Sequence, residues 1–206
     1  MWDERYAGAE YFYGTEPNDF LRARAAAIPA GGRVLCLGEG EGRNAAFLAG
    51  LGLDVVALDQ SKEGLRKALE LAAARGVKIA TVQADLAGYD IEPGAWDAIT
   101  SIWCHLPSQL RARVHAQVVA GLKPGGVFIL EAYRPEQLRF GTGGPKDVDL
   151  LPTLAALRQE LPGLAFEHAA ELERDVREGG GHSGQSAVVQ VLARQPLRPA
   201  RPATPG

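Results

Sequence analysis

Short apolar runs alternate along the chain with longer segments in which apolar residues recur at helical spacing. The apolar runs are bounded by Gly and Asp and predict strands at 34–37, 55–58, 79–83, 98–103 and 127–130. The periodic segments predict helices at 20–27, 43–49, 62–75, 108–122 and 153–161. Strands that alternate with helices are typical of βαβ units on a buried parallel sheet. We therefore expect an α/β fold that is Rossmann-like and doubly wound, with helices on both faces of the sheet.

The C-terminal part of the chain departs from this alternation. Two further strands are expected near 164–177 and 186–194, and only the glycine-rich link 179–184 separates them. A connection this short implies an antiparallel hairpin, because a parallel pair needs a longer crossover. The expected sheet is therefore seven-stranded and mainly parallel, with one antiparallel strand.

Local signals set several boundaries. Ser61 is expected to cap the following helix, Gly76 to end it in a left-handed conformation, and 123–126 to form a turn. Residues 1–30, rich in Tyr, Phe and acidic side chains, form an expected N-terminal aromatic cap segment before an α/β domain at 31–195. The proline-rich stretch 196–206 is expected to be a disordered tail.

Composition narrows the class of protein. The 206 residues are 46% hydrophobic and 23% charged, which favours one globular domain. A net charge of −3 argues against nucleic-acid binding, and no apolar run is long enough to span a bilayer. The N-terminal residues lack the pattern of a secretory signal. We expect a cytoplasmic enzyme or binding protein with no membrane and no nucleic-acid partner.

Cysteine and histidine positions exclude several chemistries. Cys36 and Cys104 lie in apolar contexts and are expected to be reduced and buried. The four histidines show no metal-ligand spacing, so no metal site is expected. They are His105, His115, His168 and His182.

Polar residues follow five of the predicted strands. They are Gly38–Gly42, Asp59, Asp85, His105 and Glu131. Carboxyl ends of parallel strands are where doubly wound sheets bind ligands. The first loop reads G-x-G-x-G, and Arg43 stands where a dinucleotide fingerprint would need glycine, which argues against a nicotinamide dehydrogenase. Glu39 and Glu41 would repel a pyrophosphate, so a cationic adenosine ligand fits better.

At this point the chain resembles class I S-adenosylmethionine-dependent methyltransferases, in the tellurite-resistance (TehB-like) and thiopurine-methyltransferase-like branch. The resemblance covers residues 2 to about 195, and 31–195 would be the methyltransferase domain. The motifs that carry it are Trp2-Asp3-Glu4-Arg5-Tyr6, Tyr13-Gly14-Thr15-Glu16-Pro17-Asn18, Gly38-Glu39-Gly40-Glu41-Gly42-Arg43-Asn44-Ala45, Ala84-Asp85-Leu86 and Leu122-Lys123-Pro124-Gly125-Gly126.

The resemblance implies S-adenosylmethionine as cofactor and S-adenosylhomocysteine as product. It assigns Gly38, Gly40 and Gly42 to the methionine part, Asp59 with the adjacent Gln60 to the ribose end, and Asp85 and Leu86 to the adenine. Many relatives have an acid at the position of Cys36, and Glu39 is a candidate to supply that charge instead. Arg43 either meets the methionine carboxylate or points to solvent.

Two histidines are candidates for the acceptor site. His105 leaves the fourth strand, and it is either a catalytic group or a helix cap. His182 lies in the late hairpin, where tellurite-resistance relatives resemble this chain in carrying a histidine; it either reaches the acceptor or belongs to a mobile surface hairpin. Cys104 is expected in the core. The N-terminal aromatics would fold over the cofactor, as the resemblance implies, or act as plain core anchors.

We therefore expect a methyltransferase that acts on a small-molecule acceptor. The resemblance implies a thiol or a chalcogen oxyanion of the tellurite or selenite type. The alternative is a non-catalytic protein that binds or senses an adenosine ligand. The oligomeric state cannot be read from the sequence.

Overall fold

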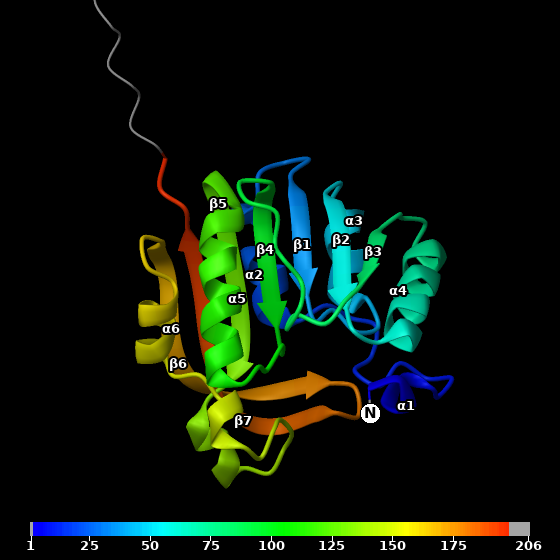
Figure 1. Cartoon of the computed structure of the whole chain (residues 1–206). Coiled ribbons are helices and arrows are strands. Elements are labelled where there is room, and N and C mark those ends of the chain that lie inside the picture. Colours follow the sequence, from blue (N-terminus) through cyan, green and yellow to red (C-terminus); the bar gives the residue numbers. More distant parts are fainter. Residues whose placement is uncertain (1, 198–206) are drawn as a thin grey trace, which may run out of the picture.

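One seven-stranded sheet forms the centre of the structure, in the order β3-β2-β1-β4-β5-β7-β6 (Figure 1). The computed structural model describes residues 2–197. The strands are β1 (Arg33–Leu37), β2 (Asp54–Asp59), β3 (Ala80–Gln83), β4 (Trp96–Ile102), β5 (Leu122–Tyr133), β6 (Ala165–Glu178) and β7 (His182–Arg194). The first five pair in parallel, as predicted.

Helices cover both faces of the sheet, as the sequence predicts. The α-helices are α1 (Trp2–Tyr6), α2 (Asp19–Arg24), α3 (Arg43–Gly50), α4 (Lys62–Ala74), α5 (Ser108–Gly121) and α6 (Leu154–Glu160). Three short 3-10 helices are η1 (Ala25–Ala27), η2 (Pro135–Arg139) and η3 (Val148–Leu150). Side chains of α2 and α3 share one buried cluster, and those of α5 and α6 share another. The sheet separates the two clusters.

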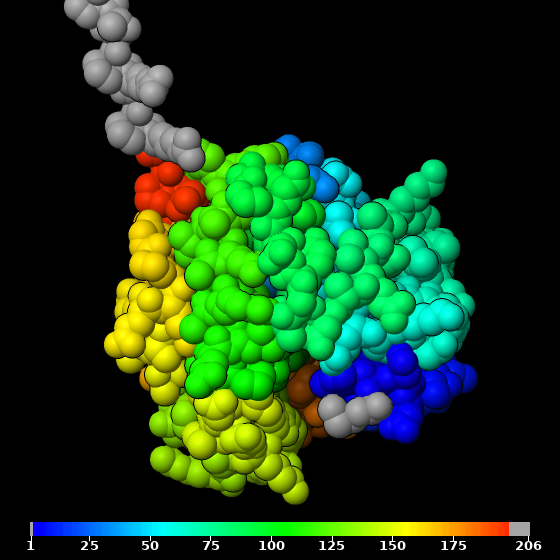
Figure 2. Space-filling view, viewed as in Figure 1, coloured from blue at the N-terminus to red at the C-terminus, as the bar shows by residue number. Residues whose placement is uncertain are grey.

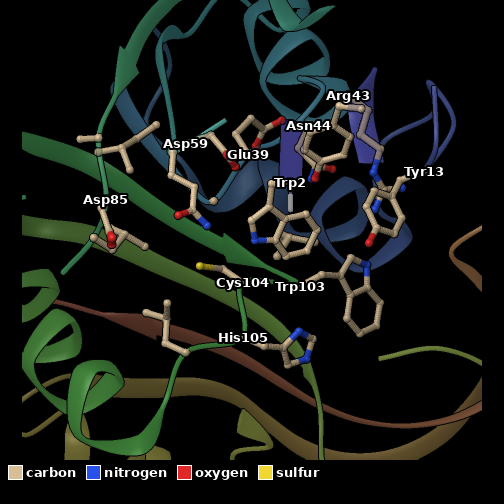
Figure 3. A pocket seen from close by; sticks show the side chains of 18 residues that line it. Trp2, Tyr13, Glu39, Arg43, Asn44, Asp59, Asp85, Trp103, Cys104 and His105 are labelled. Carbon is tan, nitrogen blue, oxygen red and sulfur yellow. The ribbon is translucent and has the colours of Figure 1, made fainter. Parts of the chain in front are cut away.

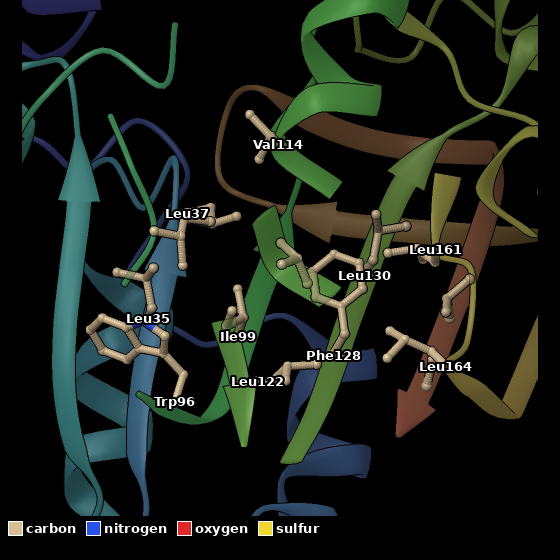
Figure 4. Packing of buried hydrophobic residues seen from close by; sticks show 14 of the residues in the cluster. Leu35, Leu37, Trp96, Ile99, Val114, Leu122, Phe128, Leu130, Leu161 and Leu164 are labelled. Carbon is tan, nitrogen blue, oxygen red and sulfur yellow. The ribbon is translucent and has the colours of Figure 1, made fainter. Parts of the chain in front are cut away.

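The strand sequences explain this two-sided core. In β1, Val34 and Cys36 pack with α2 and α3, whereas Leu35 and Leu37 belong to the cluster on the α5 side. Figure 4 shows the second cluster, in which Phe128 and its neighbours on the central strands meet side chains from α5. Each fully buried side chain of this size contributes about 1.5–3 kcal/mol to the stability of the fold. Because helices cover the strand on both sides, both of its faces are apolar.

The β6–β7 hairpin corrects one expectation. Two antiparallel pairings join the last three strands, because β7 pairs with β5 and β6 pairs with β7 along its whole length. The predicted hairpin is present, but its link is only Gly179–Gly181, and residues 183 and 184 belong to β7. The hairpin extends past the carboxyl ends of the parallel strands, where its tip lies close to α1 (Figure 1).

Two of the predicted boundaries hold, and two do not. The Ser61 hydroxyl accepts a hydrogen bond from the backbone N–H of Gly64, and Gly76 has φ +68° after α4. The predicted turn at 123–126 lies inside β5, as an irregularity where the register with β4 shifts. The predicted helix at 20–27 is divided between α2 and η1.

The expected ends of the chain fall partly outside the described structure. Of the predicted tail, residues 198–206 lie outside the described residues, and 196–197 form neither helix nor strand. Across residues 2–197, no helix combines the length and the apolar character needed to cross a bilayer.

Candidate functional site

A pocket opens at the carboxyl ends of β1, β2, β3 and β4, where doubly wound sheets bind ligands. About 800 Å³ of space free of protein atoms lies within it, and part of that space is open to solvent. Figure 3 shows Glu39 and Asp59 on one side, Trp103, Cys104 and His105 on the other, and Trp2 between them. Seven of the nine predicted cofactor residues line it: Gly38, Glu39, Arg43, Asp59, Gln60, Asp85 and Leu86.

The three loop glycines serve different purposes. Gly38 lines the pocket, and a Cβ there would lie 2.7 Å from Cys104 Sγ, so glycine lets the loop approach the end of β4. Gly40 and Gly42 do not line the pocket. A Cβ would lie 2.7 Å from Tyr6 Oη at Gly40 and 2.4 Å from Ala68 Cβ at Gly42. These two glycines allow α1 and α4 to pack against the loop.

Asp59 ends β2 and is buried beneath the first loop. Its Oδ2 accepts a hydrogen bond of 2.8 Å from the backbone N–H of Gly40, and its Oδ1 accepts one of 2.8 Å from Ser61. Burial raises the pKa of Asp59 above its usual value, although these backbone donors oppose the shift. Because each carboxylate oxygen can accept more than one hydrogen bond, Asp59 can order the loop and still accept from a ligand hydroxyl.

Glu39 is the acid of the first loop that lines the pocket. Its Oε1 accepts a hydrogen bond of 2.7 Å from the backbone N–H of Ala45, at the start of α3. Burial raises the pKa of Glu39 to about 7, against the stabilising effects of this backbone donor and of Arg43. Cys36 is fully buried behind the loop and does not line the pocket. Any charge that this loop offers to a ligand therefore comes from Glu39.

Glu41 does not face the pocket, contrary to the expectation that both loop acids meet the ligand. Its carboxylate forms a buried ion pair of 2.7 Å with Lys67 and accepts a hydrogen bond of 2.8 Å from the backbone N–H of Phe12. Lys67 Nζ also donates to the carbonyl of Glu10 at 2.7 Å. Glu41 and Lys67 thus anchor the N-terminal segment to α4.

Arg43 lies at the start of α3 and lines the pocket, but it does not point to solvent. Only 6% of Arg43 is exposed, and its guanidinium forms an ion pair with Glu178, the last residue of β6. Arg43 Nη1 also donates to the backbone carbonyl of Glu16 at 3.2 Å. The alternative that Arg43 is a solvated helix residue is therefore wrong.

Glu178 is the centre of a buried polar network that no local sequence pattern predicts. Its carboxylate accepts hydrogen bonds from Trp103 Nε1 at 2.6 Å and from Asn18 Nδ2 at 2.8 Å, besides Arg43. Asn18 Nδ2 also donates to Glu131 at 2.5 Å, and Arg174 donates to both oxygens of Glu131. The only sequence features that pointed to this network were two acids that follow predicted strands, Glu131 and Glu178, and an asparagine in a motif of the resemblance, Asn18.

Asp85 and Leu86 line the end of the pocket that lies beyond β3. Leu86 is buried and joins the apolar cluster on the α5 side. Asp85 is exposed, and its Oδ1 accepts a hydrogen bond of 2.8 Å from the backbone N–H of Ala87. The pair therefore offers an apolar surface next to an accessible carboxylate.

His105 lines the pocket, and its ring is held by the backbone. Its Nε2 accepts a hydrogen bond of 3.1 Å from the N–H of Tyr133, and burial lowers the pKa of His105 to about 4. The imidazole is therefore uncharged at neutral pH. It does not cap α5, because the backbone N–H of Ser108 instead donates to Asp149. The expectation that Cys104 is buried needs a similar correction, since Cys104 is half-buried and lines the pocket.

His182 does not line the pocket, and the hairpin tip that carries it is packed rather than free. The imidazole is 5% exposed, stacks on the ring of Tyr13 at 4.6 Å, and lies 2.8 Å from Tyr133 Oη. Burial lowers the pKa of His182 to about 3, so the imidazole is uncharged at neutral pH.

The triple glycine explains this close packing. A Cβ on Gly181 would lie 2.3 Å from Tyr13 Cε1, and one on Gly179 would lie 2.4 Å from the Phe12 carbonyl. The backbone N–H of Gly180 donates to the same carbonyl at 2.9 Å. Figure 2 shows the N-terminal segment against the hairpin.

The residues present fit a cationic adenosine ligand. Glu39, Asp59 and Asp85 offer carboxylates to an ammonium group, ribose hydroxyls and a base, and the backbone at Gly38 is open to close approach. Three N-terminal aromatics also line the pocket: Trp2, Tyr6 and Tyr13. Within residues 2–197, no group of three or more His, Cys, Asp or Glu side chains is arranged to hold a metal ion.

Comparisons with known proteins agree with this fit. Residues 34–126 match a family model described as a methyltransferase domain, and no curated protein matches the chain. TehB from Haemophilus influenzae is similar at 21% identity and a TM-score of 0.69, over 84% of this chain and 60% of that chain. A SAM-dependent methyltransferase from Methanosarcina mazei is similar at 16% identity and a TM-score of 0.70, over 89% and 100%.

A third solved structure, described as "Conversion of a Disulfide Bond into a Thioacetal Group during Echinomycin Biosynthesis", is similar at 20% identity and a TM-score of 0.75, over 96% of this chain and 89% of that chain. Identities this low show a shared fold alone. The chain thus has the Rossmann-like fold of methyltransferases, and its residues 34–126 match a methyltransferase domain.

Proposed function

We propose that this chain is an S-adenosylmethionine-dependent methyltransferase that acts on a small molecule. The observation that carries the proposal is the pocket itself, where Glu39, Asp59 and Asp85 gather at three consecutive strand ends around an open glycine loop. These carboxylates suit a ligand that has a positive charge and a ribose. The match of residues 34–126 to a methyltransferase domain supports the same conclusion.

Each part of the cofactor has a proposed partner. Asp59, next to Gln60, would accept hydrogen bonds from the ribose hydroxyls, and Asp85 with Leu86 would receive the adenine. Glu39 would meet the methionine amino group in place of an acid at position 36. Arg43, which has guanidinium N–H groups beyond those bound by Glu178 and Glu16, would meet the methionine carboxylate.

The protein's contribution to the reaction would be alignment and exclusion of water. The cofactor, when bound, supplies an electrophilic methyl group on a sulfonium. Trp2, Tyr13 and Trp103 surround the pocket with aromatic rings, which keep water from the reacting groups and orient a flat or apolar acceptor. Cys104 is no covalent nucleophile in this scheme, because burial raises the pKa of its thiol to about 12.

The acceptor is proposed to be a thiol or a chalcogen oxyanion, as the resemblance implies. The wall formed by Trp103, Cys104, His105 and Leu106 favours the thiol, because none of these side chains is charged at neutral pH. An oxyanion placed there would find no cation to compensate its lost hydration. His105 could act as a base only if the acceptor displaced the Tyr133 N–H from Nε2, and His182 only if its aromatic neighbours moved.

A non-catalytic binding or sensing protein is the second candidate. The observation that favours it is that both candidate bases are uncharged and already hydrogen-bonded. In a sensor the same pocket would bind the adenosine ligand, and no acceptor would be consumed.

One experiment separates the two candidates. Calorimetry with S-adenosylhomocysteine tests the cofactor site, and release of this product from S-adenosylmethionine tests methyl transfer. Benzyl mercaptan and its para-carboxylate form a matched pair of acceptors, with selenite and tellurite as the oxyanion arm. Turnover with the uncharged thiol above that of the carboxylate supports the proposed enzyme, turnover with the oxyanions alone contradicts the thiol preference, and binding without turnover of any acceptor favours the sensor.

A further inference from the structure

A buried ion pair joins the pocket to the tip of the β6–β7 hairpin. Arg43 and Glu178 are each 6% exposed, and their side chains are in direct contact. Arg43 lines the pocket, whereas Glu178 lies behind it and reaches the opposite wall through its hydrogen bond from Trp103 Nε1. The hairpin thus places a negative charge next to the pocket without exposing that charge to a ligand.

This pair determines the sign of the charge that a ligand meets. Of the pocket-lining side chains that the structure describes, three are carboxyls, at Glu39, Asp59 and Asp85, and one is basic, at Arg43. Coulomb interactions are strong in a partly desolvated site, so an unpaired guanidinium would offset much of the attraction that the carboxyls offer to a cation. Glu178 neutralises Arg43 from behind and leaves the carboxyls in excess.

We infer that Glu178 is a specificity-determining residue that makes the pocket prefer the cationic sulfonium cofactor over the uncharged demethylated product. The inference rests on the proposed function. S-adenosylmethionine differs from S-adenosylhomocysteine by one methyl group and one positive charge, so the two ligands share every contact except those of the methyl group and those that sense the charge. A pocket with excess negative charge therefore binds the cofactor preferentially and releases the product.

A purely structural role for Glu178 predicts a different result. Glu178 also accepts hydrogen bonds from Asn18 and Trp103 and forms a second, longer ion pair of 3.5 Å with Arg174, so its loss could loosen the pocket and weaken both ligands alike. The ratio of the two dissociation constants separates these roles, because loosening changes both constants and a change of charge changes their ratio.

The test measures both dissociation constants by calorimetry on the full chain. Glu178→Gln keeps the size of the side chain and an acceptor for Trp103 but removes the charge, and the preference for S-adenosylmethionine should fall at least threefold. Arg43→Gln removes the opposite charge, and the preference should rise at least threefold even if both ligands bind more weakly. Either variant alone tests the inference if the other fails to fold, and the double variant should return the ratio to that of the unmodified protein.

Glu131→Gln is the matched control. Glu131 is as deeply buried and belongs to the same network, but its side chain bonds Asn18, Arg174 and Gln190, none of which lines the pocket. The ratio should not change in this variant. An unchanged ratio in Glu178→Gln and Arg43→Gln would overturn the inference, as would an equal shift in Glu131→Gln. If the unmodified protein bound neither ligand, the proposed function would fail first.

Discussion

The two walls of the pocket differ in how they use charge. One wall comes from the loop after β1 and the ends of β2 and β3, and it presents the carboxyls of Glu39, Asp59 and Asp85. The other wall comes from the end of β4 and the N-terminal segment, and its side chains are aromatic, aliphatic, thiol or imidazole groups. The same pocket therefore offers carboxyl groups on one side and uncharged groups on the other.

Burial acts on both walls and favours the uncharged form on each. It raises the pKa of Glu39 to about 7 and lowers the pKa of His105 to about 4. The outcome differs because burial raises the pKa of an acid towards neutrality and lowers the pKa of a base away from it. Glu39 becomes titratable at neutral pH, whereas His105 remains uncharged throughout. The pH dependence of this protein should thus originate in its carboxyl wall.

Removing Asp59 should disable the carboxyl wall and give the largest effect. Asp59→Ala removes the acceptor proposed for two ribose hydroxyls, at about 1.5–3 kcal/mol for each charge-assisted bond, and also frees the backbone N–H groups of Gly40 and Ser61. We expect affinity for S-adenosylhomocysteine to fall tenfold or more by calorimetry. Asp85→Asn, at an exposed position, should cost less. Equal losses in the two variants would contradict the special role of Asp59.

Crowding the hairpin tip should disrupt the aromatic wall. In Gly181→Ala the new Cβ would lie 2.3 Å from the ring of Tyr13, so Tyr13 must move away from the pocket and from His182. Overpacking of this kind costs about 1–3 kcal/mol, measurable by thermal or denaturant unfolding. Gly180→Ala is the matched control, since its Cβ would have only one neighbour, the Phe12 carbonyl at 3.9 Å. Similar stabilities in both variants would mean that Tyr13 yields without cost.

The strands and the carboxyl-lined wall of the pocket could be predicted from the sequence, because local residue patterns determine them. Apolar runs ending in glycine or aspartate predict buried parallel strands, and acids at consecutive strand ends must meet at one edge of the sheet. Asp59 and Asp85 are found at that edge. The Ser61 cap was predictable for the same reason, since its partner lies only three residues away.

The contacts of the aromatic wall could not be predicted from the sequence, because they join segments that are far apart in the chain. Nothing local in the hairpin indicates that Tyr13 will stack on His182 or that Glu178 will pair with Arg43. The packing role of Gly42 could not be predicted for a related reason. A glycine in a loop of this type suggests a ligand, whereas here it allows Ala68 of α4 to approach.

Changing the pH should alter ligand binding at the carboxyl wall through the ionisation of Glu39. A cationic ligand favours the ionised carboxyl, so affinity for S-adenosylmethionine should rise as the pH increases through about 7, by at most about tenfold between pH 6 and 8. Glu39→Gln should abolish this rise in calorimetric titrations. A rise that persists in Glu39→Gln would assign the titrating group elsewhere.

The stability of the ligand-free protein should change in the opposite direction. The folded state holds the proton of Glu39 up to about pH 7, whereas the unfolded chain releases it near the ordinary value of 4.5. The Glu39 contribution to stability is therefore lost as the pH rises between these values. Unfolding of Glu39→Gln should lack this decline.

The smallest expected effect concerns the imidazoles. Since burial lowers the pKa of His105 to about 4 and that of His182 to about 3, neither ring titrates between pH 6 and 8. His105→Gln and His182→Gln should therefore leave the shape of the binding profile in that range unchanged. The two rings should affect stability only in acid. Below about pH 6.5 the histidines of the unfolded chain take up protons, whereas those of the folded protein do not. Stability therefore falls as the pH decreases from 6.5 towards 4. Unfolding curves of either variant should show a shallower acid decline. If methyl transfer instead lost an inflection near neutral pH in His105→Gln, the ring would titrate at the ordinary imidazole value during turnover, and the wall at the end of β4 would supply the base.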